Sequence, residues 1–359
     1  MTEKMTAWQM TEPNRPLEKV ELPMPEPGEG EVLLRVAGCG VCHTDLGFFF
    51  DGVRIRSALP LVLGHEISGI VISAGKGAEE WAGKAVIVPA VMPCGTCDVC
   101  KRGKGNICPI QKMPGNDIQG GFASHIMVPA RDLCEVPMVN GKPKGESGVS
   151  LAELSVIADA LTTPYQAIKE SRLGILDTAI FVGVGGVGGF GTQIAKALGA
   201  LVIAIDIDQK KLELLQEHKC VDAIFDPRAM PFKDLREEVS GFVKSQGRRR
   251  TEWKIFETSG TADGQKTAFG LLPYGGYLSV VGFTMDTVEI RLSNLMAFHA
   301  TIKGTWGCLP ENYHPAMWRV LSGKVQISPF VKTYPLDDIN AVFEMVHNRE
   351  IIERAIMVP

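Results

Sequence analysis

The chain lacks any long hydrophobic run. Its 359 residues contain no uninterrupted apolar stretch of about 18 residues or more, the length that a membrane-spanning helix needs. The first eight residues, MTEKMTAW, contain no apolar core of the kind found in secretory signal peptides. We therefore expect a cytoplasmic protein with no membrane partner.

The chain also has little net charge, and it shows no internal repeat or low-complexity tract. Its 37 Lys and Arg against 41 Asp and Glu give 37 − 41 = −4 with histidine neutral. This balance argues against a nucleic-acid partner. Apolar residues make up 45% of the chain and charged residues 22%, an ordinary globular composition, and the length suggests two domains.

Cysteine and glycine, by contrast, are plentiful. There are nine cysteines, an odd number, and a cytoplasmic compartment would keep them reduced. Metal binding or catalysis is therefore the better explanation for any that cluster. The 39 glycines exceed the usual share of about 7%, which suggests many tight turns and a cofactor loop.

Two patterns of secondary structure divide the chain. The first part has short strands, such as 31–36, 65–72 and 85–88, and ends in a polar, glycine-rich segment at 141–150. Strands and helices then alternate, which predicts a doubly wound parallel sheet. We expect strands at 178–182, 201–205, 254–257 and 277–281 and helices at 188–198, 209–218 and 262–272. Two more helices are expected near 316–322 and 336–348, before a last strand at 354–358.

A glycine-rich turn follows the first strand of this alternating region. The G-x-G-G-x-G turn consists of Gly183, Gly185, Gly186 and Gly188. Such a turn lets the backbone and a helix N-terminus approach a pyrophosphate. The next strand ends in Asp206, which could bind the ribose hydroxyls of NAD and repel the 2′-phosphate of NADP. Lys211 could reach the adenosine ribose or could be a solvated lysine. The alternative for the whole motif is a glycine turn beside a surface acid.

Four cysteines lie within fifteen residues, in a lobe at about 93–109. They are Cys94, Cys97, Cys100 and Cys108. The C-x2-C-x2-C spacing lets thiolates converge on one ion, and four cysteines would leave no ligand position open for substrate. A structural zinc is the favoured interpretation. An iron–sulfur cluster is the chemical alternative, and a reactive thiol pair is a weaker third.

A second group of metal-binding side chains lies on glycine-flanked turns. Cys42 follows Gly38-Cys-Gly-Val, and His65 and Glu66 follow Gly64. A thiolate and an imidazole are good zinc ligands, and Glu66 could be a ligand or could orient one. Taken singly, Cys42 could equally be a small core residue and His65 a hydrogen-bonded histidine at a strand end.

Together, these motifs resemble the zinc-containing medium-chain alcohol dehydrogenases, in the same order and over nearly the whole chain. The resemblance implies an α/β two-domain fold. A GroES-like, β-rich catalytic domain would comprise 1–160 and 309–359, and a Rossmann NAD-binding domain would comprise 161–308. It further implies a homodimer or homotetramer with two zinc ions per subunit, one catalytic and one structural.

The resemblance also implies a catalytic zinc site. Its ligands would be Cys42, His65 and a residue just before the cofactor domain. Many family members have cysteine at that third position, where this chain has Asp159. Aspartate is an acceptable zinc ligand, although a carboxylate there could also serve a helix N-terminus. Glu66 would lie near the metal and tune its ligand shell.

Further roles follow by the same resemblance. Thr44 matches the hydroxyl that accepts the proton of the substrate alcohol. His43, Thr163 and Arg354 match positions that contact the pyrophosphate, the nicotinamide and a phosphate of the cofactor. Gly47 stands where many members have a histidine that ends the proton relay. The proton must therefore leave through the ribose hydroxyls, water or another side chain.

The resemblance also implies a small-molecule alcohol as the substrate. Within the family, the stretches 115–125, 158–164 and 304–308 resemble dehydrogenases of cyclic hydroxyacyl-CoA thioesters from anaerobic aromatic degradation. A CoA thioester would favour cationic contacts, for which Arg54, Arg56 and the run 248–250 are candidates, although solvated surface arginines are the alternative. A simple secondary-alcohol or polyol dehydrogenase is the second hypothesis. A non-catalytic zinc- and nucleotide-binding protein of the same fold is the third.

Overall fold

The computed structural model describes residues 3–359, which divide into two compact units. Unit 1 comprises Met1–Thr162 and Gly307–Pro359, and unit 2 comprises Thr163–Trp306. The boundaries expected from sequence, 160/161 and 308/309, differ from these by two residues at each crossing. The first crossing falls at the start of helix α3 (Thr162–Ser171), where a continuous helix leaves no loop to mark it.

Unit 1 consists mainly of antiparallel strands. Within residues 3–359, its larger sheet has the order β17-β18-β3-β5-β6-β8, with β7 paired to β3, and a smaller sheet has the order β2-β1-β4. The strands are β1 Lys4–Met10, β2 Glu18–Pro23, β3 Glu31–Gly40, β4 Leu61–Val62, β5 Glu66–Ala74, β6 Ala85–Val88, β7 His125–Pro129, β8 Cys134–Glu135, β9 Met138–Val139, β10 Lys142–Pro143, β17 Val331–Pro335 and β18 Arg354–Val358. The helices are α1 His43–Phe49, α2 Asp98–Lys101, α9 Tyr313–Leu321 and α10 Ile339–His347.

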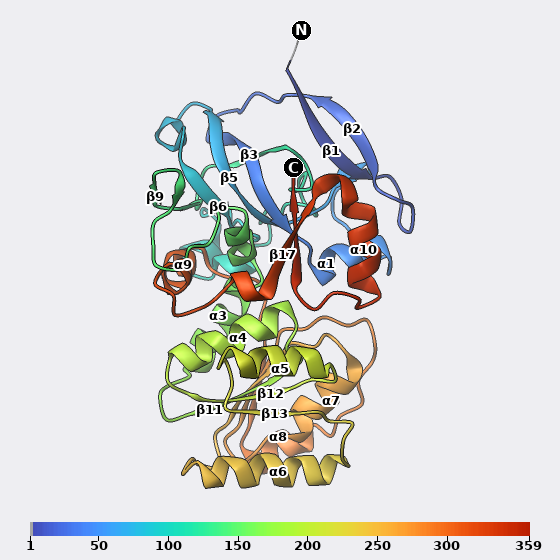
Figure 1. The fold of residues 1–359 in the computed structure, drawn as a ribbon, viewed down its shortest axis with the longest axis vertical. Coiled ribbons are helices and arrows are strands. Elements are labelled where there is room, and N and C mark those ends of the chain that lie inside the picture. Colours follow the sequence, from blue (N-terminus) through green and yellow to red (C-terminus); the bar gives the residue numbers. More distant parts are fainter. Residues whose placement is uncertain (1–2) are drawn as a thin grey trace. The chain divides into compact units, whose positions relative to one another are not determined.

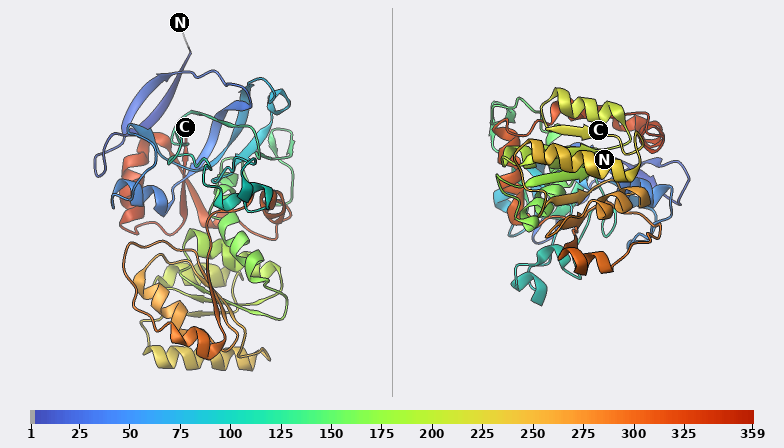
Figure 2. Two further views of the ribbon diagram at one scale, coloured as in Figure 1. Left: turned by 180° about the vertical axis from the view of Figure 1, so that it is seen from behind. Right: turned by 90° about the horizontal axis from the view of Figure 1, so that it is seen from below.

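The C-terminal segment lies in unit 1. Strand β18 pairs with β3 at Cys39 and Gly40, and β17 adds to it in parallel. Figures 1 and 2 show this segment, in red, among the blue N-terminal strands from both sides. The end of the chain therefore reaches the end of β3, directly before α1.

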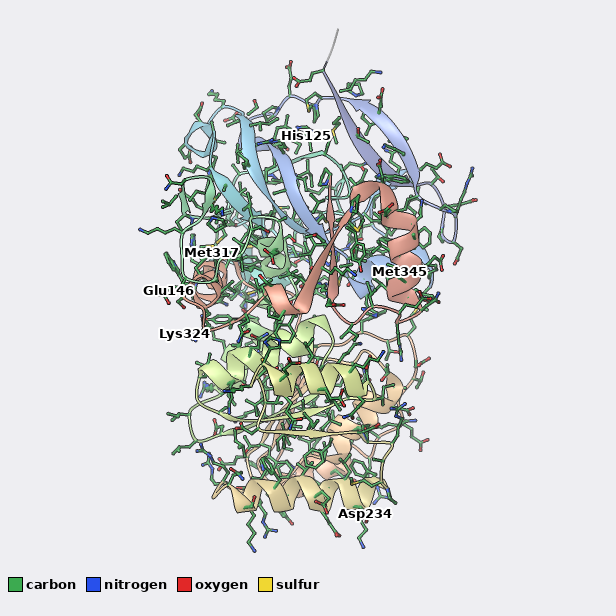
Figure 3. All side chains as sticks on the ribbon, viewed as in Figure 1. His125, Glu146, Asp234, Met317, Lys324 and Met345 are labelled. Carbon is green, nitrogen blue, oxygen red and sulfur yellow. The ribbon has the colours of Figure 1, made fainter. Side chains whose placement is uncertain are left out.

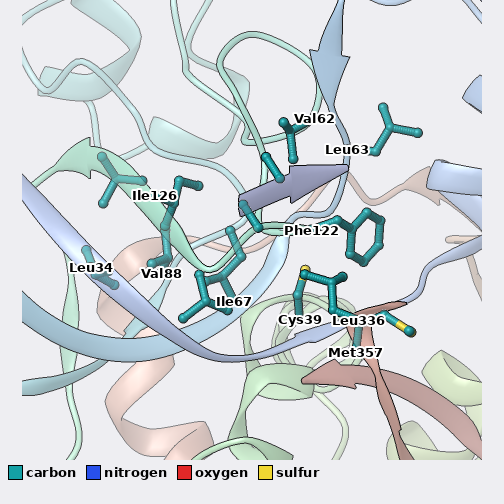
Figure 4. Close-up of a cluster of buried hydrophobic side chains, with 14 of the residues drawn as sticks. Leu34, Cys39, Val62, Leu63, Ile67, Val88, Phe122, Ile126, Leu336 and Met357 are labelled. Atoms are coloured by element: carbon teal, nitrogen blue, oxygen red, sulfur yellow. The ribbon is translucent and has the colours of Figure 1, made fainter. Parts of the chain in front are cut away.

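The core of unit 1 is apolar. Leu34 of β3, Ile67 of β5 and Phe122 are fully buried and pack together with Met357 of β18 (Figure 4). Cys39 lies within the same cluster as a buried thiol. Burying this apolar surface stabilises the sheet from which the loops of the functional site project.

Unit 2 is a six-stranded parallel sheet within the described residues, in the order β13-β12-β11-β14-β15-β16. This confirms the predicted doubly wound sheet. Strands β11 and β12 are buried along their full length, as expected where helices cover both faces. The strands are β11 Thr178–Val182, β12 Leu201–Ile205, β13 Ala223–Phe225, β14 Lys254–Glu257, β15 Tyr277–Val280 and β16 Thr301–Gly304. The helices are α4 Gly186–Ala197, α5 Gln209–Glu217, α6 Phe232–Ser245, α7 Ala262–Gly270 and α8 Ser293–Phe298.

Helices α4 and α5 cover one face of this sheet and α6 covers the other (Figure 1). Helix α6 and strand β13 are absent from the sequence prediction. Leu235, Val239 and Val243 recur at four-residue intervals along α6 and are completely buried, whereas Asp234 points outward (Figure 3). That periodicity was the available signal for a helix. In residues 3–359, no helix combines the length and apolar character needed to cross a membrane.

Candidate active site

The four-cysteine lobe brings its sulfur atoms around one point. The sulfurs of Cys97 and Cys100 are 3.4 Å apart, those of Cys97 and Cys108 3.8 Å, and those of Cys94 and Cys100 3.9 Å. All four lie within 4.8 Å of one another. A tetrahedral zinc with Zn–S bonds of about 2.3 Å would separate its sulfurs by about 3.8 Å. The lobe therefore fits one zinc. An iron–sulfur cluster fits less well, because its four cysteines are divided among two or four irons and do not all surround one point.

Arg131 binds the backbone of this lobe from the segment after β7. Its Nη1 donates to the carbonyl of Cys94 over 2.6 Å. The guanidinium covers Gly95, where a Cβ would lie 1.3 Å from Nη1. A backbone contact of this kind fixes the first cysteine without using its sulfur.

A second cluster consists of Cys42, His65, Glu66 and Asp159, whose ligand atoms also lie within 4.8 Å of one another. Cys42 caps helix α1, His65 directly precedes β5, and Asp159 follows the 3₁₀ helix Glu153–Ala158. Oδ2 of Asp159 is 3.8 Å from Sγ of Cys42 and 3.5 Å from Nε2 of His65. We call Cys42, His65 and Asp159 the catalytic triplet. All three belong to unit 1.

The catalytic triplet fits a zinc ion. Tetrahedral zinc would separate these sulfur, nitrogen and oxygen atoms by about 3.4 to 3.6 Å, close to the observed spacings. His65 is 1% exposed, yet neither of its ring nitrogens has a hydrogen-bond partner within residues 3–359. A buried polar atom without a partner is costly, and metal ligation would satisfy Nε2. Three protein ligands would leave one position for substrate, as in catalytic zinc sites.

Asp45 belongs to this site, although the sequence analysis assigned it no role. It is fully buried, and its carboxylate accepts hydrogen bonds from the backbone N–H groups of Cys42 (3.0 Å) and Gly64 (3.1 Å). Its Oδ1 lies 3.4 Å from Nδ1 of His65. Asp45 therefore orients two ligand-bearing turns at once. The available signal was an acid three residues after a helix cap, where it can reach back to the cap's N–H.

A carboxylate oxygen of Glu66 lies within 4.8 Å of the other ligand atoms, but both of its oxygens are already engaged by other groups. Nε of Arg354 donates to Oε2 of Glu66 over 2.7 Å, and Nη2 donates to Oε1 over 2.6 Å. Oε1 also accepts a hydrogen bond from the N–H of Ala160 (2.9 Å). Gly40 makes room for it, because a Cβ there would lie 2.1 Å from Oε2. Of the two roles left open by sequence, the contacts favour orienting the ligand peptide at Asp159. The expected contact of Arg354 with a cofactor phosphate stays a prediction.

The start of α1 carries the proposed proton acceptor. Oγ1 of Thr44 is 3.7 Å from Sγ of Cys42, and His43 is exposed at the first position of the helix. Gly47 has no side chain to continue a proton relay. A Cβ at Gly47 would lie 4.0 Å from Oδ2 of Asp51, a carboxylate on the exposed turn after α1.

The glycine turn of unit 2 has the geometry of a dinucleotide site. Gly183 has φ of +87°, and a Cβ there would lie 2.3 Å from Cα of Ser259, so only glycine fits. Gly185 caps α4, which begins at Gly186, and Gly188 packs against the carbonyl of Gly183. The N-terminus of α4 therefore offers its N–H groups to an anion.

Asp206 braces this turn from the end of β12. Its Oδ2 accepts the N–H of Val184 over 2.6 Å and its Oδ1 accepts that of Asp208 over 2.9 Å. Lys211 forms an ion pair with Asp208 at 3.7 Å, and its expected contact with the ribose stays a prediction. Thr163 lies at the start of unit 2 with 8% of its surface exposed, and its expected contact with the nicotinamide also stays a prediction.

Glu257 and Thr258, at the end of β14, are further residues of the dinucleotide site that the sequence analysis missed. Oγ1 of Thr258 donates to the carbonyl of Gly183 over 2.5 Å. Buried Glu257 accepts the N–H of Ser259 (2.8 Å), and burial raises the pKa of its carboxyl. No local sequence motif identifies them, because they reach the glycine turn only through the pairing of β14 with β11.

Comparison with known proteins gives matches along both units. Residues 28–138 match the alcohol dehydrogenase GroES-like domain, and residues 186–322 match the zinc-binding dehydrogenase family. An alcohol dehydrogenase of Geobacillus stearothermophilus is 30% identical over 355 residues, or 98% of each chain. The crystal structure of the alcohol dehydrogenase of Aeropyrum pernix is 29% identical, with a TM-score of 0.85 over 99% of this chain and 100% of that one. Acetophenone reductase of Geotrichum candidum, in complex with NAD, is 25% identical, with a TM-score of 0.84 over 100% and 98%.

Metal binding at the catalytic triplet is expected to depend on pH. Burial disfavours the charged ring of His65, but the carboxylates of Asp45 and Asp159 outweigh it and raise its pKa well above the usual value. Zinc must displace that proton as well as the proton of the Cys42 thiol, so its affinity should fall by at least about tenfold for each pH unit below the raised pKa.

The measurement is zinc competition against a chelating dye between about pH 8 and pH 6. The four-cysteine lobe provides a second metal site within the same sample, so metal content per chain is followed together with affinity. An affinity at the catalytic triplet that stays constant over this range would contradict the assignment of Cys42 and His65 as ligands.

Proposed function

The chain belongs to the zinc-dependent alcohol dehydrogenase family and has its GroES-like and Rossmann domains, and we propose that it oxidises a secondary alcohol with NAD as hydride acceptor. The observation that carries the proposal is the catalytic triplet, with its buried, unsatisfied His65, in a chain that also has a dinucleotide turn. Two zinc ions per subunit, one in each cluster, are part of the proposal.

The bound cofactors supply chemistry that side chains lack: zinc acts as a Lewis acid that lowers the pKa of an alcohol, and NAD accepts the hydride. The protein's own residues position the groups that would bind these cofactors. Asp45 holds the N–H of Gly64, directly before His65, and Glu66 holds the N–H of Ala160, directly after Asp159. In unit 2, Asp206 holds the glycine turn and favours NAD over NADP by charge repulsion with a 2′-phosphate.

Thr44 is the proposed proton acceptor. Its hydroxyl can take the alcohol proton while it passes its own proton on, so that no net charge is left on the side chain. Gly47 has no side chain to take the proton further, so solvent or a ribose hydroxyl of the bound cofactor would have to receive it. Asp51 is the carboxylate nearest to that position and offers a further acceptor.

We infer a finer substrate assignment from the sequence resemblance: 6-hydroxycyclohex-1-ene-1-carbonyl-CoA, oxidised to its 6-oxo product in anaerobic aromatic degradation. Arg54 and Arg56 support it, since both are exposed on the segment after α1. A phosphate would compete with Asp117 for Arg56, because these two side chains form an ion pair at 3.4 Å. Arg249 is engaged with Asp177 and Glu252. A simple secondary-alcohol or polyol substrate fits the named relatives equally well and is the second candidate.

A homo-oligomer is also part of the proposal. Strand β16 is an edge of its sheet in the described residues, and N–H groups of Thr301 and Thr305 point toward the neighbouring strand. The intervening N–H groups of Ile302 and Gly304 therefore face outward, free to pair with a second copy. Large apolar side chains of unit 2 are exposed as well: Phe283, Met285, Leu292 and Met296.

We place the protein in a reducing compartment, the cytoplasm. All nine cysteines are free thiols, as both metal clusters require.

Replacement of Cys42 by serine should abolish turnover. Without the thiolate the catalytic triplet loses its strongest zinc ligand, and kcat should fall by about 10³-fold or more. The far-ultraviolet circular dichroism and the midpoint of thermal unfolding should stay close to those of the parent. Cys220→Ser, which removes a buried thiol of unit 2, is the matched control. Full activity of the Cys42→Ser protein would make the metal assignment wrong.

The substrate assignment is tested by NAD reduction on a panel. It contains 6-hydroxycyclohex-1-ene-1-carbonyl-CoA, cyclohexanol and a vicinal diol, each also assayed with NADP. We expect the thioester to have the highest kcat/KM. The double change Arg54→Ala and Arg56→Ala should raise KM for the thioester by about tenfold and leave that for cyclohexanol unchanged. Equal kcat/KM for cyclohexanol and the thioester would favour the simple-alcohol alternative.

The oligomer is tested by analytical ultracentrifugation. Gly304→Pro removes an outward N–H group from the edge strand and should shift the protein toward a smaller species. Gly304→Ala is the control, since nothing lies within 4 Å of a Cβ at that position. If the proline variant keeps the parent's sedimentation coefficient, the interface lies elsewhere.

A further inference from the structure

Asp159 is a short ligand whose position depends on its backbone. It follows the last residue of the 3₁₀ helix Glu153–Ala158 and has φ of −142° and ψ of −60°, which is not helical. A single methylene separates its carboxylate from Cα, so few rotamers are available to correct a displaced peptide. The peptide groups on either side of Asp159 must therefore be fixed for Oδ2 to meet Cys42 and His65.

The carbonyl of Ala158, on the N-terminal side, is bound by a tyrosine from a distant part of the chain. Tyr313 is the first residue of α9 and is 1% exposed. Its hydroxyl donates to the carbonyl of Ala158 over 2.6 Å and accepts the N–H of Ala90 over 3.1 Å. The N–H of Ala90 also approaches the same carbonyl, at 3.4 Å. Tyr313 thus bridges the end of β6 to the peptide that precedes the ligand.

A second hydroxyl contacts the same carbonyl. Oγ1 of Thr162 donates to it over 3.3 Å, one helical turn further along. On the C-terminal side of Asp159, the N–H of Ala160 is held by Glu66, which Arg354 fixes in turn. Asp159 therefore stands between two peptide groups that are both anchored to other segments of unit 1.

From this arrangement we propose that Tyr313 is a positioning residue for metal binding, which sets the place of the Asp159 carboxylate by holding the carbonyl of Ala158. The inference rests on the proposed role of Asp159 as a zinc ligand. It assigns Tyr313 a function outside the family motifs, and it makes the return of the chain at Gly307 a condition for completing the metal site.

The tyrosine hydroxyl is suited to this task. Burial raises the pKa of Tyr313 well above its usual value, so the group stays protonated and able to donate. Without the hydroxyl, the N–H of Ala90 would keep only its 3.4 Å contact, and the carbonyl of Ala158 would lose its shortest hydrogen bond. The peptide could then shift, and Asp159 would shift with it.

The test uses the full-length protein with Tyr313→Phe, which removes one oxygen atom and keeps the ring. Tyr334→Phe is the matched control, because the hydroxyl of Tyr334 is also buried in unit 1 but has no hydrogen-bond partner within residues 3–359. Zinc affinity is measured by competition with a chelator, and the ligand geometry by the visible absorption of the Co²⁺-substituted protein.

We expect Tyr313→Phe to weaken zinc binding at the catalytic triplet by about 10- to 100-fold, the usual effect of losing a group that orients a ligand. The Co²⁺ bands of that site should shift, while the four-cysteine lobe keeps its metal and its charge-transfer absorption. Tyr334→Phe should match the parent in both measurements. A purely structural role for Tyr313 would lower the unfolding midpoint without this site-selective change.

Two more variants separate the possible failures. Asp159→Ala should weaken zinc binding at least as much as Tyr313→Phe. If Asp159→Ala has no effect, the proposed ligand set is wrong and the inference falls with it. If Asp159→Ala weakens binding but Tyr313→Phe does not, the ligand set stands and the role of Tyr313 is overturned. Should Tyr313→Phe fail to fold, Tyr313→Met removes the same hydroxyl with a flexible apolar side chain: a selective loss at the catalytic triplet supports the inference, and parental affinity overturns it.

Discussion

The buried ion pair of Glu66 and Arg354 is the contact on which the rest of the site depends. Arg354 opens the C-terminal strand β18, and Glu66 opens β5, so the pair joins segments 288 residues apart. Burial alone would lower the pKa of Arg354, but the carboxylate of Glu66 outweighs it and raises the pKa, so the guanidinium stays charged. A buried charge that loses its partner is costly, which makes this pair a strict condition for the local fold. Through Oε1 it also fixes the N–H of Ala160, next to Asp159.

The site is built by layers of support around a few ligand atoms. Asp45 holds the turns of Cys42 and Gly64, Glu66 holds the peptide after Asp159, and Tyr313 holds the peptide before it. Each support acts through backbone N–H or carbonyl groups, which have fixed directions. This arrangement explains how a short side chain such as that of Asp159 can meet the side chains of Cys42 and His65. Unit 2 uses the same device, since Asp206 and Thr258 both hold backbone groups of its glycine turn.

Local sequence patterns predicted secondary structure most accurately. The alternation of apolar strands and helices in unit 2 gave β11, β12 and β14 with their observed bounds, because each strand is a short buried run between turn residues. Helix α6 was missed although its leucine and valines recur regularly, since its charged residues dominate the segment's composition. Asp45 was missed for another reason: it was part of a recognised motif, but only the folded chain shows that it is buried beneath His65.

The sequence by itself determined the chemistry that is written in contiguous residues. Four cysteines within fifteen positions and a glycine turn after a strand need only local backbone geometry to form a zinc lobe and a dinucleotide site. The tertiary structure decided which partners surround each carboxylate of this site. Glu66 follows His65 directly in sequence, yet both of its oxygens accept hydrogen bonds from Arg354, whereas Asp159 approaches from 117 residues beyond Cys42. The reason is that a carboxylate's role depends on the partners around it, and those partners meet only when distant strands pair.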